Sequence, residues 1–115
     1  MRLGRFYGKY ENTDRQNKIS HLTKAFSKLE SLEELHLQHN VVANFPEELL
    51  EMPRLRVVNL AYNNLKQLPN SIGQMTNLEM IDVNHNQLRY LPYEMAYLTN
   101  LKDLLCTHFL ELLHV

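Results

Sequence analysis

The chain has 115 residues, of which 44% are hydrophobic and 22% charged, and its formal net charge is −1. This length allows one domain, and the composition is that of a folded globular protein rather than a disordered or low-complexity chain. The balanced charge argues against nucleic acid as the main ligand, because phosphate binding needs a strongly basic surface, and no run of 18 apolar residues is present to span a membrane.

The N-terminal part of the chain is basic although the whole is not. Residues 1–28 contain seven Lys and Arg and two Asp and Glu, a charge of 7 − 2 = +5, so the remainder carries −1 − 5 = −6. We interpret residues 1–16 as a basic N-terminal arm that can be disordered, as chain termini often are. Such an arm could make weak contact with an anionic membrane, which leaves a membrane-surface adaptor as one alternative function.

The segment 17–31 predicts the second half of a structural repeat. Its apolar residues fit a pattern that is complete only further along the chain, and counting back 23 residues from the start of that pattern gives Lys9. In this register Asn12 and Asp14 stand where a strand would place inward apolar side chains. We therefore expect the strand of this first repeat to be lost.

A pattern of similar residues recurs three times in the middle of the chain. It reads LEELHLQHNVVANFP from Leu32, LRVVNLAYNNLKQLP from Leu55 and LEMIDVNHNQLRYLP from Leu78, so each step is 78 − 55 = 55 − 32 = 23 residues. Self-similarity at a fixed period of this size is typical of a solenoid, in which each turn of chain stacks on the next. Residues 32–100 therefore contain three full repeats.

Each repeat predicts one short strand. Ile81 and Val83 alternate with Met80, Asp82 and Asn84, so the first two should point inward and the other three outward. Because all copies run in the same direction, their strands can pair only in parallel, about 4.8 Å apart, with a crossover between them.

The crossovers are short and follow a proline. Their apolar residues lie three apart, which should direct them into the core from the convex side. With so few residues available, a short helix, a 3₁₀ turn or an extended segment fits better than a long helix. The inward pairs are Leu49 with Met52, Ile72 with Met75, and Met95 with Leu98.

An asparagine follows the strand pattern in every repeat. The sharp turn there leaves backbone groups inside without partners from the sheet, and an inward amide can both donate to and accept from them. Buried polar groups are nearly always satisfied in such a way. We predict a structural ladder formed by Asn17, Asn40, Asn63 and Asn86.

The last segment, 101–115, keeps the pattern only in part. Phe109 stands at the asparagine position and no proline follows, so we interpret this segment as a degenerate terminal repeat. The chain thus looks like a window of a longer array. A truncated or splice-form fragment without independent binding activity is a second alternative.

The pattern L-x-x-L-x-L-x-x-N-x-L-x-x-L-P-x-x-I-x-x-L-x-x over residues 32–100 resembles leucine-rich repeats of the 23-residue intracellular kind, in particular the Ras-suppressor-like group that includes Scribble-like and Erbin-like scaffolds. The resemblance implies an α/β fold: a right-handed superhelix with a parallel concave sheet and short helical or irregular convex segments. It also implies a non-catalytic protein–protein interaction module or scaffold in intracellular signalling. By resemblance, small GTPases and phosphatase subunits are partner classes.

The outward strand positions and the turn that follows them form the candidate partner-binding surface. Polar side chains stack there in columns with a tyrosine, a residue favoured at binding hot spots. The candidate residues are His36, Gln38, His39, Asn59, Tyr62, Asp82, Asn84, His85 and His108.

Two further observations concern metal binding and catalysis. His85 and His108 on neighbouring strands, with Asp82 nearby, superficially resemble a zinc pair, but a third and a fourth ligand are missing, so we predict no metal and no cofactor. Cys106 falls at an inward strand position, which predicts a buried core thiol rather than a nucleophile, and no enzyme activity is expected.

A single cysteine and the lack of an Asn-x-Ser/Thr site favour a reducing intracellular, cytoplasmic location.

Overall fold

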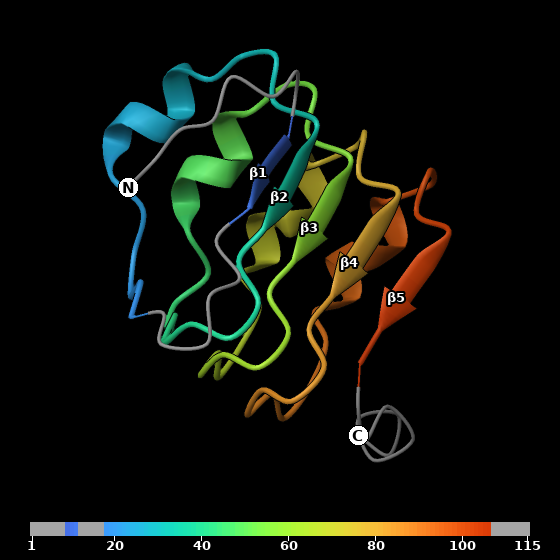
Figure 1. Cartoon of the computed structure of the whole chain (residues 1–115). Coiled ribbons are helices and arrows are strands. Elements are labelled where there is room, and N and C mark those ends of the chain that lie inside the picture. Colours follow the sequence, from blue (N-terminus) through green and yellow to red (C-terminus); the bar gives the residue numbers. More distant parts are fainter. Residues whose placement is uncertain (1–8, 12–17, 107–115) are drawn as a thin grey trace.

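The computed structural model describes residues 9–11 and 18–106, and in these residues five strands form one parallel sheet in chain order (Figure 1). Each strand has three residues and pairs in parallel with its sequence neighbours. The parallel solenoid predicted from the repeat is therefore confirmed. The strands are β1 (Lys9–Glu11), β2 (Glu34–His36), β3 (Val57–Asn59), β4 (Met80–Asp82) and β5 (Asp103–Leu105).

Four short 3₁₀ helices cover one face of this sheet (Figure 1). A proline stands immediately before the second, third and fourth of them, and its ring fixes the backbone φ at the point where the chain turns into the helix. Five residues per helix leave the crossover short, as the sequence pattern indicates. The helices are η1 (Lys24–Lys28), η2 (Glu47–Glu51), η3 (Asn70–Gln74) and η4 (Tyr93–Tyr97).

A single hydrophobic core fills the space between the sheet and the helices. The central strand residues Leu35, Val58 and Ile81 are fully buried and lie side by side in the paired register. From the helical side, the predicted apolar pairs reach the same core, although Met95 is only half-buried. At Gly73, η3 approaches η4 so closely that a Cβ atom would lie 2.9 Å from the Glu94 carbonyl oxygen.

The first strand lies where the sequence count predicts none. Lys9–Glu11 pair with Glu34–His36, so the step between the first two strands is 34 − 9 = 25 residues rather than 23. Tyr10 takes the inward position and is buried. Its ring packs edge-on against Phe26, with 5.2 Å between the ring centroids.

The physical reason for this error is a local change of length. Two additional residues between β1 and β2 shift the register, so that Tyr10 rather than Asn12 corresponds to Leu35, the first inward position. A strict 23-residue count cannot detect such an insertion. Part of the segment assigned to the basic arm is therefore a strand; Asn12, Asp14 and the rest of residues 1–16 lie outside the described residues, as do Asn17 and the segment 107–115.

No helix in residues 9–11 and 18–106 is long and apolar enough to cross a membrane.

Candidate functional site

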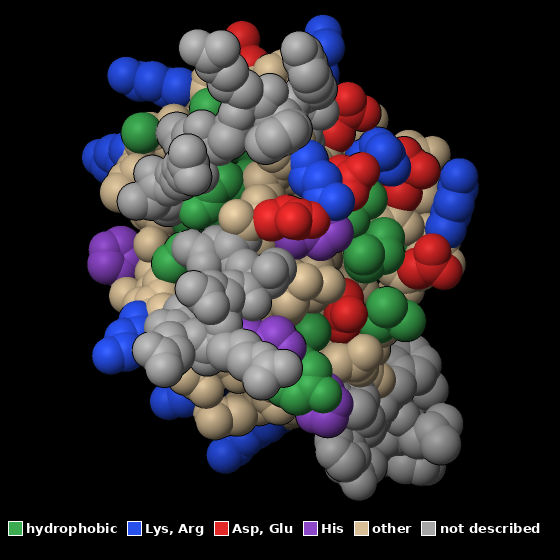
Figure 2. Space-filling model, in the orientation of Figure 1, with side chains coloured by type: hydrophobic (Ala, Val, Ile, Leu, Met, Phe, Trp, Pro, Cys, Tyr) green, Lys and Arg blue, Asp and Glu red, His purple; other side chains and the backbone are tan. Residues whose placement is uncertain are grey.

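The sheet face opposite the helices, called the concave face below, carries the outward strand side chains (Figure 2). The parallel register places these side chains in two columns that run across β2–β5. Acidic, apolar and polar side chains therefore alternate over one continuous surface. The columns are Glu34, Val57, Met80 and Asp103, and His36, Asn59, Asp82 and Leu105.

Acidic groups on the β1–β2 side of this face have cationic neighbours. Lys9 Nζ lies 2.7 Å from Glu11 Oε1, and this hydrogen bond is the main reason that the pKa of Lys9 is raised and the pKa of Glu11 is lowered. Glu34 Oε2 lies 3.3 Å from Arg56 Nη2, and Glu34 Oε1 is hydrogen-bonded to His36 Nε2 at 3.1 Å. Glu11 and Glu34 thus each have a basic partner within the chain, although Arg56 is shared with Glu33.

The β3 and β4 strands end in side chains that bond to their own backbone. Asn59 Oδ1 accepts a hydrogen bond from the Ala61 N–H, and Asp82 Oδ1 accepts one from the Asn84 N–H, both at 3.0 Å. Asx side chains favour this bond to the backbone two residues on. The two candidate residues Asn59 and Asp82 are therefore held in similar orientations on adjacent strands.

Beyond the strands, three rings form a continuous stack. His39 and Tyr62 have ring centroids 4.5 Å apart and planes 16° apart, and Tyr62 and His85 have centroids 4.1 Å apart and planes 13° apart. The column also continues the sheet hydrogen bonds, since the Tyr62 N–H donates to the Asn84 carbonyl oxygen at 2.9 Å. We call His39, Tyr62 and His85 the aromatic stack.

All three residues of the aromatic stack have left-handed backbones, with φ of 62°, 55° and 56°. Residues other than glycine adopt this conformation at a cost of about 1–2 kcal/mol, and Asn tolerates it better than most. The turn that leads into the ladder asparagine therefore imposes this φ at the same place in each repeat. It also fixes the direction in which each ring leaves the chain.

We predict that Tyr62→Val is less stable than Tyr62→Asn by about 1 kcal/mol. Both substitutions remove the two ring contacts, but a β-branched side chain is strained at positive φ whereas Asn is not. Denaturant unfolding of the two variants measures the difference directly. Equal stability would mean that the backbone at residue 62 does not hold the left-handed conformation.

The remaining described candidate residues contribute less surface. Gln38 and Asn84 are half-buried, and Ala61 between them is buried. The side chains of this column therefore expose little surface to a partner. His36 is half-buried beside Glu34. His108 lies outside the described residues.

The asparagine side chains connect successive repeats below this surface. Each amide nitrogen donates to carbonyl oxygens at the turn of its own repeat. Those of Asn63 and Asn86 also donate to the preceding repeat. Each amide oxygen accepts a backbone N–H from the preceding repeat, at 3.0, 3.0 and 2.8 Å: Asn40 from Ile19, Asn63 from Val42 and Asn86 from Leu65.

Cys106 follows β5 and packs against the core, but it is half-buried rather than buried. Its pKa is raised, first by burial and then by the negative charge of Asp82. A thiol with a raised pKa stays protonated at neutral pH, whereas a nucleophile must be a thiolate. Over the described ranges, no three His, Cys, Asp or Glu side chains are placed to hold a metal ion.

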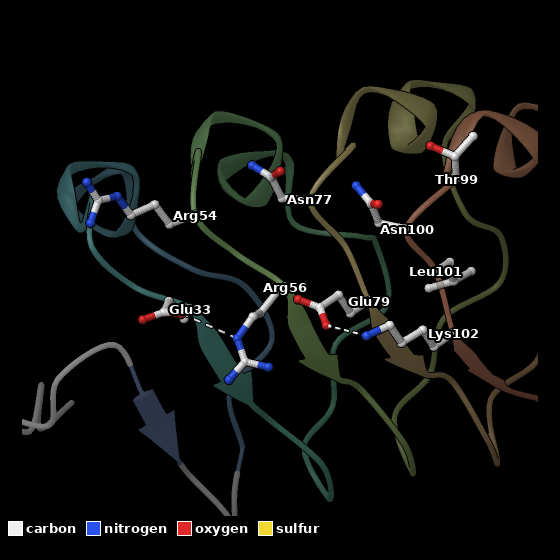
Figure 3. A pocket seen from close by; sticks show the side chains of 9 residues that line it. All are labelled: Glu33, Arg54, Arg56, Asn77, Glu79, Thr99, Asn100, Leu101 and Lys102. Carbon is white, nitrogen blue, oxygen red and sulfur yellow. Dashed lines mark hydrogen bonds and ion pairs between the residues drawn. The ribbon is translucent and has the colours of Figure 1, made fainter.

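Sequence reasoning missed a polar groove of about 680 Å³ at the edge where the strands begin (Figure 3). Glu33, Arg56, Glu79 and Lys102 follow one another there at the 23-residue step with alternating charge. Arg56 Nε lies 3.3 Å from Glu33 and Lys102 Nζ lies 3.5 Å from Glu79. The alternating signs at one repeat position were the available signal in the sequence.

Amide side chains occupy the other side of this groove. Asn77 Nδ2 donates to the Pro53 carbonyl oxygen at 2.6 Å, and Asn100 Nδ2 donates to the Thr76 carbonyl oxygen at 2.8 Å. Four charged side chains of the groove thus pair with one another, and both amides bond to the backbone of the preceding repeat.

Comparisons with known proteins agree with this geometry. A family model described as Leucine rich repeat matches residues 46–108. Among solved structures, a leucine-rich repeat protein of Leptospira interrogans is similar with a TM-score of 0.70 and 32% sequence identity, over 81% of this chain and 25% of that protein. The chain thus spans a quarter of the length of that protein. No curated protein matches the chain.

Proposed function

Because the chain belongs to the leucine-rich repeat family, whose domains generally mediate protein–protein interaction, we propose that it is a non-catalytic module that binds a protein partner on its concave face. Proteins of this family are typically not enzymes, and the family model that matches the chain does not indicate a catalytic activity.

The aromatic stack is the observation that carries this proposal. Tyr62 is 47% exposed although both of its ring faces are covered by imidazoles. Such a ring is already ordered, so little conformational entropy is lost when a partner covers its remaining surface. Tyrosine is also among the residues that contribute most to binding free energy at interfaces.

The polar groove is a weaker candidate for the partner site. Its ion pairs and amide bonds join neighbouring repeats, and a ligand would have to replace them. Exposed ion pairs of this type contribute only about 0–1 kcal/mol each. We interpret them as contacts between neighbouring repeats rather than as a ligand site. The concave face offers a larger set of side chains that point away from the chain.

A role in intracellular signalling is a further part of the proposal. It is supported by the resemblance of the repeat pattern to the Ras-suppressor-like group, and by that resemblance the partner classes are small GTPases and phosphatase subunits. The single cysteine and the lack of a glycosylation site also favour a reducing compartment.

The test compares two variants that remove the same side-chain types from different surfaces. Tyr62→Asn/His85→Asn removes the stack while keeping residues that tolerate positive φ. Tyr93→Asn/His21→Asn changes an exposed tyrosine and an exposed histidine outside the concave face. Proteins captured by the wild-type chain from extracts of its own cells are identified, and the purified partner is titrated against each variant.

We expect the Kd of the stack variant to rise about tenfold or more, because loss of a hot-spot residue costs about 2 kcal/mol. The Kd of the matched variant should stay close to that of the wild type. Thermal melts establish that both variants are folded. Unchanged affinity of the folded stack variant would exclude the concave face as the partner site.

A further inference from the structure

The outward side chains of β4 and β5 form a chequered patch of acidic and apolar groups. Met80 pairs with Asp103, and Asp82 pairs with Leu105, so each carboxylate lies beside an apolar side chain of the neighbouring strand. The two carboxylates lie on a diagonal, with about 8 Å between their Cα atoms from standard strand spacing and rise. We call these four residues the β4–β5 patch.

Charge compensation stops at this patch. Glu11 and Glu34 on the same sheet face have ion-pair partners in Lys9 and Arg56. Within residues 9–11 and 18–106, neither Asp82 nor Asp103 forms an ion pair with a basic side chain. The carboxylates of β1 and β2 on this face therefore have basic partners, whereas those of β4 and β5 do not.

The negative charge of Asp82 acts on its surroundings. It is the second cause, after burial, of the raised pKa of the Cys106 thiol.

The apolar members of the patch are also open to contact. Leu105 is 43% exposed and Met80 is half-buried, and both stand on the same face as the carboxylates. Figure 2 shows acidic and hydrophobic side chains interspersed over this part of the sheet. An aliphatic chain that ends in a cation matches this arrangement, because its stem can cover apolar surface while its charged head remains at the carboxylates.

We propose that the β4–β5 patch recognises an arginine side chain of the protein partner, presented by a basic segment. The inference rests on the proposed function and names the partner's chemistry. The arginine stem lies against Met80 and Leu105, and the guanidinium lies between Asp82 and Asp103. Arginine fits better than lysine, because its planar group has five donors and can reach both carboxylates at once.

The magnitude of the effect follows from exposure. Exposed ion pairs contribute little individually, and two such pairs with one guanidinium correspond to about a tenfold change in Kd. Because exposed charges are screened, the effect should shrink when the ionic strength rises from about 0.05 M to 0.5 M.

The probe is an acetylated, dye-labelled eight-residue peptide of alternating arginine and alanine, titrated by fluorescence anisotropy at low salt. Asp82→Asn/Asp103→Asn removes both carboxylates and keeps an Oδ1 at residue 82 that can accept the Asn84 N–H. Glu47→Gln/Glu51→Gln removes the same charge from exposed residues of η2, on the other side of the sheet. A peptide of alternating glutamate and alanine measures attraction that does not depend on a basic side chain.

We expect the basic peptide to bind the wild-type chain and the η2 variant alike, and the patch variant about tenfold more weakly. Backbone amide shifts in NMR spectra should change at β4 and β5. Equal weakening of the two variants, shifts that lie elsewhere, or no binding at low salt would each overturn the inference. If these outcomes occur while the stack variant still loses the natural partner, the proposed function stands and only the arginine site is wrong.

Discussion

Replacing Asn63 with alanine is expected to lower the free energy of unfolding by about 3 kcal/mol or more. The side chain is 6% exposed and makes four hydrogen bonds to the backbone. Its Oδ1 accepts the N–H of Val42, a fully buried residue of the preceding repeat. After the substitution this donor has no partner, which costs about 1–3 kcal/mol. The carbonyl groups of Leu37, Leu60 and Ala61 each keep one hydrogen bond and lose the one from Asn63, at about 0.5–1.5 kcal/mol for each bond lost.

The matched control for this prediction is Asn100→Ala. The Asn100 amide donates one hydrogen bond, at 2.8 Å, to the Thr76 carbonyl oxygen, and it does so at an exposed position where water can replace it. We expect a loss below about 1 kcal/mol for this variant. Denaturant unfolding of both proteins gives the comparison, and similar losses would show that burial of the ladder amide does not decide its contribution.

The repeat made most of the fold predictable. One position of the repeat is occupied by Leu35, Val58 and Ile81, at a step of 23 residues. A position that is apolar in every copy can be recognised as a core position from the sequence. The turn asparagines follow from the same logic, because a turn that repeats leaves the same backbone groups unpaired each time. A single sequence therefore contains three copies of the information that defines one repeat.

The first repeat was less predictable, because it differs from the others in length. Tyr10 is a core residue, but it stands 25 residues before Leu35 rather than 23. Its ring partner Phe26 fits the 23-residue repeat, so Phe26 could be predicted as a core residue. The strand β1, which packs Tyr10 against it, could not be predicted. Recognising the tyrosine would have required allowing an insertion between β1 and β2.

The sequence predicts which residues of the candidate site share a column, but not their backbone conformation or the distances between their side chains. The shared position of His39, Tyr62 and His85 is visible in the sequence, but their left-handed φ is not, because none of them is glycine or asparagine. The stacking distances depend on that φ. Likewise, the positions of Asp82 and Asp103 follow from the repeat, but their lack of a basic partner depends on where lysine and arginine side chains lie.

The last prediction concerns how stability is distributed along the solenoid. Phe26→Ala is expected to remove about 3–5 kcal/mol from the N-terminal repeat, because the side chain is fully buried and contacts the Tyr10 ring. In a solenoid each repeat contacts only its neighbours, so a loss of this size at one end should open that end before the rest. Hydrogen exchange should then accelerate at the Val41 N–H, which bonds to the Ile19 carbonyl oxygen.

The central repeat provides the contrast. The Tyr62 N–H, bonded to the Asn84 carbonyl oxygen, should keep most of its protection in Phe26→Ala. Leu60→Ala, which creates a cavity at a fully buried central position, should reduce protection at both amides, since its repeat has packed neighbours on both sides. Uniform loss of protection in Phe26→Ala would instead show that the chain unfolds as one cooperative unit, and the concave face would then depend on the N-terminal core as strongly as on its own.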